Sequence, residues 1–300
     1  MSDVTDRTPK PVRSSGTFTL GAGSSPGATT VHRLGYGAMQ ITGDGVWGEP
    51  ADRDACIAVL RRAVDLGVDI IDTADSYGPE VSERLIFEAL HPYPDGLVIA
   101  TKAGLTRQGP GQWLPVGRPE YLRQQCELSL RRLGLERIDL FQLHRIDPKV
   151  PAEEQFGLLA DLVAEGKVAH IGLSQVSVAE LETAQKVVPV VSVQNLFNLT
   201  NRSSADVLAH CEAADIGFIP WFPMASGELS GPHTAMGAIV ADTGATPTQV
   251  ALSWLLHHSP VMLPIPGTKS VAHVEENCEA ATLQLTPEQM AALTAIHEAS

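Results

Sequence analysis

The sequence has few aromatic residues, few cysteines and no long apolar run. Only 5% of its 300 residues are Phe, Trp or Tyr, and its four cysteines lie far apart. No cysteine pair has the spacing of a metal site, so we expect four reduced thiols and no bound metal. No stretch approaches the ~20 apolar residues that cross a bilayer, and no apolar signal segment follows Met1. These absences predict a cytoplasmic protein without a membrane anchor.

Basic residues are also scarce. The chain has 21 Lys and Arg against 35 Asp and Glu, which gives a formal net charge of −14. Such a surface repels polyanions, so we expect no nucleic-acid partner, and an anionic cofactor would need a local cationic pocket. The apolar content of 44% is ample for a sizeable core. The profile is that of a cytoplasmic enzyme.

The sequence does contain a regular alternation of strand-like and helix-like segments. Residues 1–16, rich in Pro, Ser and charge, are expected to be a disordered tail, and Thr17–Leu20 and Thr30–Leu34 are expected to pair as a hairpin. The expected strands are Leu34–Met39, Val68–Thr73, Leu97–Thr101, Ile138–Leu143, Ala169–Leu173, Val190–Gln194, Gly217–Phe222 and Val261–Ile265. The expected helices are Arg53–Leu66, Val81–Leu90, Pro119–Leu133, Ala152–Glu165, Val178–Val187, Ser203–Ala214, Thr248–His257 and Val271–Ala280.

This alternation predicts a single (β/α)8 TIM barrel over residues 17–300, of α/β class, with an extra C-terminal helix at Pro287–His297 capped by Thr286. A doubly wound sheet is the rival fold, and it requires a Gly-x-Gly-x-x-Gly turn that opens a helix. Gly35 and Gly37 begin such a motif, but Gln40 stands in its last place and no helix follows directly. The barrel is therefore the better prediction.

Polar residues end three successive strands of the expected barrel. Asp72 ends the strand at Val68–Thr73, with Tyr77 five positions later in the loop, and the next two strands end on Lys102 and His144. The active sites of such barrels lie at the C-terminal ends of the strands. Any one of these residues alone would have a structural interpretation, such as a cap or a rim charge. Four of them on one rim predict a catalytic site.

The four side chains suit acid catalysis. A tyrosine has a pKa of about 10, so it is a poor acid until its anion is stabilised. We expect the Lys102 ammonium to lower the pKa of Tyr77 and Asp72 to hold that ammonium in place. Tyr77 could then protonate a carbonyl oxygen that His144 orients. No thiol nucleophile or metal triad is visible, so a bound cofactor must supply the hydride.

The same residues resemble the catalytic tetrad of the aldo-keto reductases. The motifs are Asp72-Thr-Ala-Asp-Ser-Tyr77, Ala100-Thr-Lys102 and Gln142-Leu-His144, and the resemblance runs from about Leu34 to about Leu283. It implies a nicotinamide cofactor and the reduction of aldehydes or ketones to alcohols.

The later strand ends could hold that cofactor. Ser174, Gln175 and Gln194 could hydrogen-bond its carboxamide, and Trp221 could stack on its ring. Ile265–Ser270, which leads into a helix, could form an anion cradle for its phosphates. The cofactor residues that the resemblance implies are Gly37, Ala38, Met39, Asp72, Ser174, Gln175, Gln194, Trp221, Phe222, Pro223, Gly267, Thr268, Lys269, His273, Glu276 and Asn277.

Two positions depart from the family pattern. Gln175 stands where the family usually has Asn after the serine, which keeps the amide but lengthens its reach. His273 stands where many NADPH-specific members have an arginine. Because Lys269 can still attract a 2′-phosphate, we expect NADP(H) to be preferred, with NAD(H) also accepted.

Most of the tryptophans lie at or after strand ends, where they would line a pocket. We expect Trp47, Trp113, Phe222 and Met224 to wall an apolar substrate cleft beside Tyr77 and His144. Two other functions stay open. One is a barrel that binds a phosphorylated metabolite at the 265–270 cradle without a redox step, and the other is a nicotinamide-binding regulatory subunit with little turnover.

Overall fold

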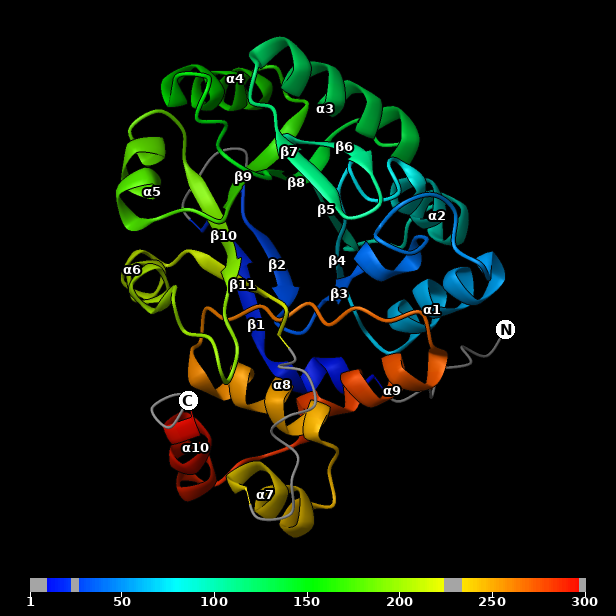
Figure 1. The fold of residues 1–300 in the computed structure, drawn as a ribbon, viewed down its shortest axis with the longest axis vertical. Helices are drawn as coiled ribbons and strands as arrows, with labels where there is room; N and C mark the ends of the chain where they lie inside the picture. The colour runs from blue at the N-terminus through cyan, green and yellow to red at the C-terminus, as the bar shows by residue number, and fades with distance from the viewer. Residues whose placement is uncertain (1–9, 23–26, 224–233, 297–300) are drawn as a thin grey trace, which may run out of the picture.

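A curled parallel sheet forms the centre of the computed structural model, which describes residues 10–22, 27–223 and 234–296 (Figure 1). Within these ranges seven strands pair side by side in the order β11-β10-β9-β8-β5-β4-β3. Their bounds are β3 Tyr36–Gly37, β4 Ile70–Asp72, β5 Val98–Ala103, β8 Ile138–Leu143, β9 Val168–Ser174, β10 Val190–Leu196 and β11 Gly217–Trp221. Each coincides with an expected strand, although β3 and β4 are shorter.

The eighth expected strand, Val261–Ile265, is not a regular strand, yet it takes the eighth place in the barrel. On one side the Leu263 N–H donates to the Phe218 carbonyl of β11 at 2.8 Å, and on the other the Gly35 N–H donates to the Pro264 carbonyl at 2.9 Å. Proline has no N–H to donate, so a regular ladder cannot form through this segment. The segment still connects both edges of the sheet, and the fold is the predicted (β/α)8 barrel.

Two glycines allow this segment to run against β3. A Cβ atom on Gly37 would lie 2.6 Å from the Ile265 carbonyl oxygen, and one on Gly267 would lie 2.5 Å from the Gly37 carbonyl oxygen. Real Cβ atoms do not come so close to backbone oxygens, so any larger residue would push the two backbones apart.

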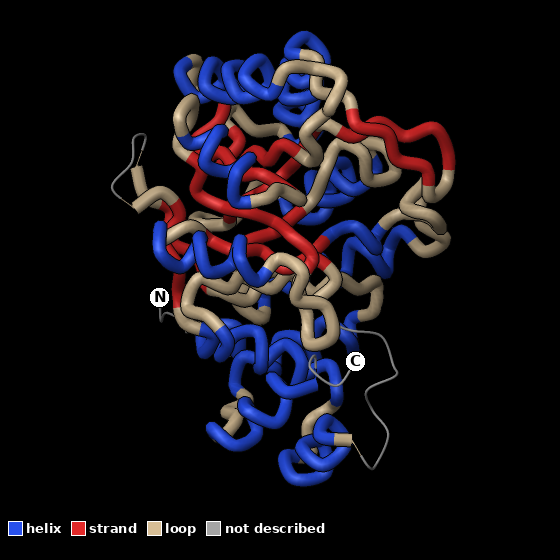
Figure 2. The backbone as a smooth tube through the Cα atoms, turned by 60° about the vertical axis from the view of Figure 1, so that its left-hand side comes forward, coloured by secondary structure: helices blue, strands red, loops and turns tan. Residues whose placement is uncertain are grey.

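Helices surround the strands, as Figure 2 shows with helices in blue and strands in red. Their bounds are α1 Arg53–Asp65, α2 Val81–Leu90, α3 Pro119–Leu133, α4 Ala152–Ala164, α5 Val178–Gln185, α6 Ala205–Ala214, α8 Pro247–His258 and α9 Val271–Glu279. All of these were predicted. The helix α7, Ala235–Thr243, was not, because the sequence there was assigned to a loop. No helix in the described ranges is both long and apolar enough to span a bilayer.

The extra C-terminal helix is present as α10, Pro287–Thr294. Thr286 caps it as expected, because the Thr286 hydroxyl accepts from the Gln289 N–H and the Gln289 side chain accepts from the Thr286 N–H. This reciprocal pair satisfies two backbone donors that the first turn of a helix leaves free. The helix packs against α7 and α8 on the outside of the barrel (Figure 1).

The predicted N-terminal hairpin closes the barrel at the end opposite the polar strand ends. Its strands are β1 Thr17–Leu20 and β2 Thr29–His32, and they pair antiparallel. Phe18 and Leu20 are buried in the main core cluster, and His32 hydrogen-bonds Asp69 just before β4 begins. The hairpin therefore forms the floor of the barrel.

The prediction of a disordered tail is wrong for the residues that immediately precede the hairpin. Pro11–Ser15 form a short 3-10 helix, η1, in which Val12 is fully buried. Arg33 fixes the end of this helix, because its Nε donates to the Ser15 carbonyl at 2.8 Å. Residues 1–9 lie outside the described ranges.

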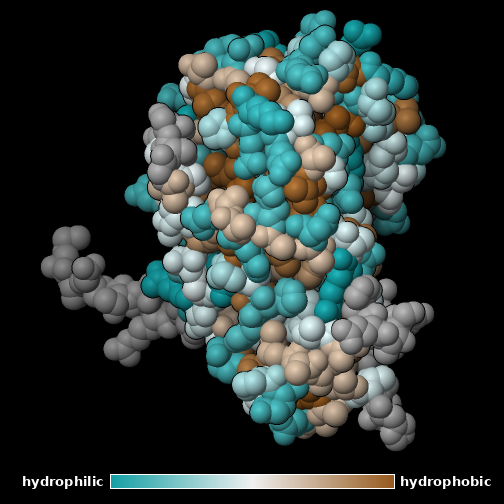
Figure 3. All heavy atoms as spheres, turned by 90° about the vertical axis from the view of Figure 1, so that its left-hand side faces the viewer, coloured by the Kyte–Doolittle hydropathy of each residue, from teal (hydrophilic) through white to brown (hydrophobic). Residues whose placement is uncertain are grey.

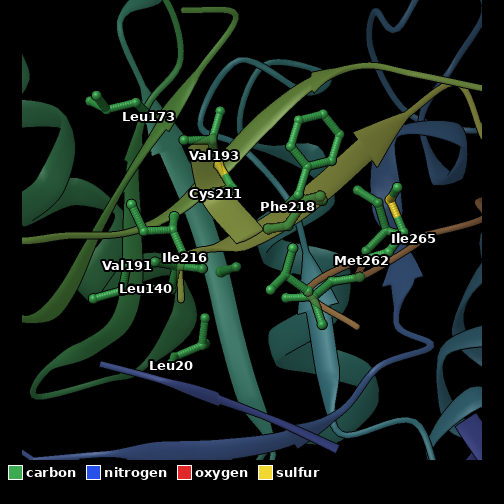
Figure 4. Packing of buried hydrophobic residues seen from close by; sticks show 14 of the residues in the cluster. Leu20, Leu140, Leu173, Val191, Val193, Cys211, Ile216, Phe218, Met262 and Ile265 are labelled. Atoms are coloured by element: carbon green, nitrogen blue, oxygen red, sulfur yellow. The ribbon is translucent and has the colours of Figure 1, made fainter. Parts of the chain in front are cut away.

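Buried apolar side chains fill the barrel and the spaces between the sheet and the helices. Among the described residues they form two clusters, and Figure 4 shows part of the larger one, with Leu20 of the hairpin below Phe218 of β11 and Ile216, which directly precedes that strand. On the face drawn in Figure 3, hydrophilic residues predominate and apolar residues appear as scattered groups. The burial of apolar surface is thus the main source of stability.

A second hairpin stands over the C-terminal ends of the strands and was not predicted. Its strands are β6 Leu105–Gly109 and β7 Gln112–Pro115, which follow β5 and pair antiparallel. It carries Trp113 toward the ends of β4 and β8, so it supplies part of the wall of the candidate site described next.

Candidate active site

The polar residues at the ends of β4, β5 and β8 come together, as their strand positions predict. The Lys102 ammonium donates to Asp72 Oδ1 at 2.5 Å, to the Thr73 carbonyl at 2.9 Å and to the Tyr77 hydroxyl at 3.4 Å. Lys102 is fully buried and Asp72 is 2% exposed. A buried ammonium and carboxylate each need a partner, so this pair fixes the position of both side chains.

Two amides hold the other oxygen of Asp72. The Nε2 atoms of Gln142 and Gln194 donate to Asp72 Oδ2 at 2.9 and 2.8 Å. Gln194, expected to bind the cofactor carboxamide, therefore directs its NH₂ group to the carboxylate. The sequence analysis did not assign a role to Gln142. A signal for Gln142 was present in the sequence, because it lies near the end of the expected strand Ile138–Leu143, two residues before His144, and side chains two apart on a strand face the same side.

His144 lies beside Tyr77 with its ring turned on edge. The ring centroids are 5.9 Å apart, the ring planes meet at 81°, and His144 Nδ1 lies 3.3 Å from the Ser76 hydroxyl. Burial lowers the pKa of His144 well below its usual value, and the charges of Lys102 and Arg145 lower it further. The imidazole is therefore neutral near pH 7, and it can donate or accept a hydrogen bond without adding charge.

The direction of the pKa shift of Tyr77 differs from the expectation. Burial raises the pKa of Tyr77, and the opposing effect of the Lys102 charge is smaller, so the net pKa lies above its usual value. For Lys102, burial alone would lower the pKa, but the charges of Asp72 and Tyr77 outweigh it and the pKa is raised. Tyr77 is thus a phenol and Lys102 an ammonium near pH 7.

An arginine from the second hairpin fixes the loop that carries Tyr77. Arg107 donates to the Ser76 carbonyl at 2.9 Å, to the Gly45 carbonyl at 2.7 Å and to the Gln112 carbonyl at 2.9 Å. Its guanidinium also lies 3.6 Å from the centre of the Trp113 ring, a cation–π contact. No sequence pattern pointed to Arg107, because its partners are backbone oxygens brought together only by the fold.

A pocket of about 620 Å³ opens above these residues. Its lining residues are Gly37, Met39, Gln40, Val46, Asp72, Tyr77, Leu105, Trp113, Pro115, His144, Arg145, Ser174, Gln194, Trp221, Phe222, Pro223, Ile265 and Gly267. The structure thus brings together most of the residues expected to bind cofactor or substrate. The volume is that of a site for a small molecule.

Other expected site residues lie outside the pocket lining. Trp47 is half-exposed at the mouth, with its ring 5.8 Å from the Arg107 guanidinium, and Met224 lies outside the described residues. The backbone carbonyl of Ala38 accepts from Ser82. Thr268 is buried, and its carbonyl accepts from the Tyr36 hydroxyl at 2.5 Å.

The expected phosphate-end residues lie at and within α9. Lys269 and His273 are exposed, and the Ser270 hydroxyl caps the helix by accepting from the His273 N–H. Glu276 is tied to α8, because it accepts from the Thr246 hydroxyl at 2.6 Å, and Asn277 is buried. Lys269 and His273 are therefore exposed to solvent, whereas Glu276 contacts the start of α8 and Asn277 is buried.

Gln175 contacts Trp221 directly. The Trp221 Nε1–H donates to Gln175 Oε1 at 2.9 Å, which fixes the indole at the pocket edge. The backbone of Gln175 is left-handed, with φ of 58°. Because Asn adopts this conformation more readily than other residues with a Cβ, the geometry explains why an Asn suits this position.

The cysteines and potential metal ligands do not form a second reactive centre. All four cysteines are free and buried, and burial raises the pKa of Cys126, Cys211 and Cys278 to about 12. Such thiols are unreactive. In the part of the chain that the structure describes, no group of three or more His, Cys, Asp and Glu residues could hold a metal ion.

The barrel and the four residues Asp72, Tyr77, Lys102 and His144 are typical of one class of reductase. Comparison with known proteins identifies the family. The family model described as "Aldo/keto reductase family" matches residues 33–298, and the chain belongs to this family. An uncharacterized oxidoreductase of Schizosaccharomyces pombe is 55% identical over 89% of this chain and 87% of its own length. The pyridoxine 4-dehydrogenase of Escherichia coli is 44% identical over 94% of this chain and 99% of its own length.

Solved structures agree with the fold. A glycerol dehydrogenase from Gluconobacter oxydans superposes with a TM-score of 0.83 at 26% identity, covering 94% of this chain and 95% of that one. An aldo-keto reductase from Klebsiella pneumoniae, solved in complex with NADPH, has a TM-score of 0.78 at 25% identity and covers 94% of each chain. The chain is therefore an oxidoreductase of this family.

Proposed function

We propose that this protein is a cytoplasmic enzyme that reduces aldehyde or ketone carbonyls to alcohols with NADPH, and that Tyr77 is its general acid. The observation that supports this most strongly is the position of the Lys102 ammonium, within hydrogen-bonding distance of both Asp72 and the Tyr77 hydroxyl. The cofactor, when bound, supplies the hydride. The protein must supply a proton and hold the carbonyl in place.

The residues around the pocket divide this work. The Tyr77 hydroxyl donates its proton to the carbonyl oxygen, and Lys102 stabilises the phenolate that remains. Asp72 and its two amide partners keep Lys102 in place, so no solvent reorganisation is needed as the charge appears. Neutral His144 orients the carbonyl oxygen by a hydrogen bond, and its neutrality prevents it from competing as an acid.

The residues at the other side of the pocket are suited to a nicotinamide cofactor. Ser174 and Gln194 place hydroxyl and amide groups there, and Trp221 presents an aromatic face. From this side the pocket reaches Gly267, the start of the segment that leads to the exposed Lys269. The NADPH bound by the Klebsiella pneumoniae relative supports the choice of cofactor.

For the substrate we propose a flat, uncharged or singly charged aldehyde. The wall supplied by Trp113 favours a planar ring, and the pyridoxine acted on by the Escherichia coli relative is the alcohol that corresponds to a planar aromatic aldehyde. The test is to follow NADPH absorbance with benzaldehyde and pyridoxal. Loss of absorbance with either supports the reductase, whereas tight nucleotide binding without turnover would instead support the regulatory subunit.

Replacing Trp221 by Ala should weaken NADPH binding without unfolding the protein. One aromatic face is lost, which is worth roughly 1 kcal/mol or about a fivefold change in Kd. Trp221→Phe is the matched control, because it keeps an aromatic face and loses the hydrogen bond to Gln175. Fluorescence titration measures the Kd of NADPH in both variants. An unchanged Kd in Trp221→Ala would assign Trp221 to the substrate wall.

Replacing His273 by Arg should increase the preference for NADPH over NADH, and replacing Lys269 by Ala should decrease it. A guanidinium is always charged and binds a phosphate through two N–H groups, which an imidazole cannot do. Both residues are exposed, so we expect changes of about two- to fivefold, the size of a surface ion pair. The measurement is kcat/KM for both cofactors, with the exposed Lys186→Ala as the charge control. A His273→Arg variant of unchanged selectivity would exclude residue 273 from the phosphate site.

A further inference from the structure

One positive charge in the pocket has no role in the proton-transfer arrangement. Arg145 follows His144 directly at the end of β8, and its side chain, partly buried, lines the pocket. Its Nη1 donates to the His144 carbonyl at 2.6 Å and to the Ser174 hydroxyl at 3.0 Å. These two bonds fix the plane of the guanidinium between the catalytic histidine and the side of the pocket assigned to the cofactor.

The remaining donors of this guanidinium are available to a ligand. Within the described ranges, Nε and Nη2 of Arg145 donate to no other group, and no carboxylate lies within ion-pair distance of it. Asp72, the carboxylate of the pocket, is already paired with Lys102 and with two amides. Arg107, the other arginine near the pocket, uses its N–H groups on backbone carbonyls and its face on Trp113.

The charge of Arg145 also acts on the reacting groups. It contributes to the lowered pKa of His144, after burial and Lys102, and it opposes the rise in the pKa of Tyr77 that burial causes. Arg145, Tyr77 and His144 line the same pocket. An anionic group bound by Arg145 would therefore share this pocket with the carbonyl that Tyr77 and His144 hold.

We propose that Arg145 is a specificity residue that binds an anionic oxygen of the substrate, a carboxylate or a phenolate carried by the same ring as the reacting carbonyl. The inference rests on the proposed function and deepens it by naming a substrate class, aromatic aldehydes with an acidic oxygen substituent. Guanidinium groups bind such oxygens through two parallel N–H bonds, and the partly buried setting strengthens them. A neutral aldehyde would leave these donors to water.

The test compares 3-formylbenzoate with its methyl ester, because the two share the aldehyde and differ in charge. We expect Arg145→Met to lower the ratio of kcat/KM for the acid to kcat/KM for the ester by about ten- to hundredfold, the value of a charge-assisted hydrogen bond. Most of the loss should fall on the KM of the acid. Arg145→Lys keeps the charge without the two-pronged geometry and should give an intermediate ratio.

The matched control is Lys149→Met, which removes the same charge from an exposed position of the same loop, outside the pocket lining. It should leave the acid-to-ester ratio unchanged. An equal loss for acid and ester in Arg145→Met, or a weaker Kd for NADPH at an unchanged ratio, would overturn the proposal. Either result would mean that Arg145 only positions Ser174 or His144.

A binding measurement separates this proposal from the proposed function. Calorimetric titration with benzoate and with benzamide needs no turnover. Wild type should bind benzoate more tightly than benzamide, and Arg145→Met should lose that difference. A wild type that reduced no aldehyde could still bind benzoate more tightly than benzamide. In that case the reductase proposal would fail and the anion site would stand. If benzoate and benzamide bound equally in wild type, the anion site would fail whatever the activity.

Discussion

Tyr77→Phe should lose carbonyl reduction by about 10²–10⁴-fold, the contribution of a positioned general acid. The substitution removes a single oxygen and its proton. The phenyl ring can keep its edge contacts with His144 and Trp113, so the pocket and the affinity for NADPH should be preserved. The measurements are kcat with an aromatic aldehyde and the Kd of NADPH by fluorescence.

Tyr93→Phe is the matched control for this variant. Tyr93 also loses one hydroxyl hydrogen bond, to the Leu133 carbonyl, but it lies outside the pocket lining. It should retain turnover. If Tyr77→Phe kept a rate within about threefold of wild type, a contribution of the size expected for a positioned acid would be ruled out.

The raised pKa of Tyr77 gives this assignment a pH signature. The acid that donates the proton is present below its pKa, and burial moves that pKa upward, so the protonated form should persist through the range from about pH 6 to pH 9. The kcat/KM for carbonyl reduction should therefore be flat there. Oxidation of the alcohol needs the phenolate and should speed up as pH rises. A reduction rate that fell steadily above pH 7 would contradict the shift.

Lys102→Met should reduce turnover by about 10²-fold or more, because the charge that stabilises the Tyr77 phenolate is removed. It should also destabilise the fold by about 3–5 kcal/mol, since Asp72 would remain buried without its cation. Urea unfolding measures the second effect, and steady-state kinetics with an aromatic aldehyde measures the first.

A double variant separates the two effects. In Asp72→Asn/Lys102→Met both charges are absent, so most of the lost stability should return, while turnover should stay low. Recovery of turnover together with stability would mean that the ammonium contributes to folding and not to the reaction. A pH–rate profile of Lys102→Met that matched wild type at a normal rate would exclude the coupling between Lys102 and Tyr77.

The barrel and the grouping of the tetrad were predictable because both depend on local patterns. Asp72, Lys102 and His144 each end a strand, and parallel strands in a barrel bring such ends to one rim whatever the loops do. The helix α7 was missed because it is stabilised by packing against α8 and α10. The hairpin β6–β7 pairs locally, but its place over the barrel depends on bonds from Arg107 to backbone oxygens of other segments. The expected strand at Val261–Ile265 takes the right place in the barrel, but Pro264, which has no N–H to donate, prevents a regular ladder.

The energetic balance at the site could not be predicted from residue types. The sequence shows that Lys102 can approach Tyr77, but the sign of the pKa shift depends on how deeply the phenol is buried. The role of Arg107 depends on backbone oxygens from three separate segments. The interest of Arg145 could not be predicted for a related reason, since only the fold shows that no acid of the described residues pairs with it.

The floor of the barrel has a practical consequence for truncation. The match to the family begins at residue 33, after both strands of the N-terminal hairpin have ended. Yet Phe18, Leu20 and Val31 belong to the main core, and a Cβ on Gly217 of β11 would lie only 3.2 Å from the Phe18 ring. A protein trimmed to the residues that the family model matches would expose the base of the barrel to water. The smallest unit that folds is therefore expected to be larger than that matched region.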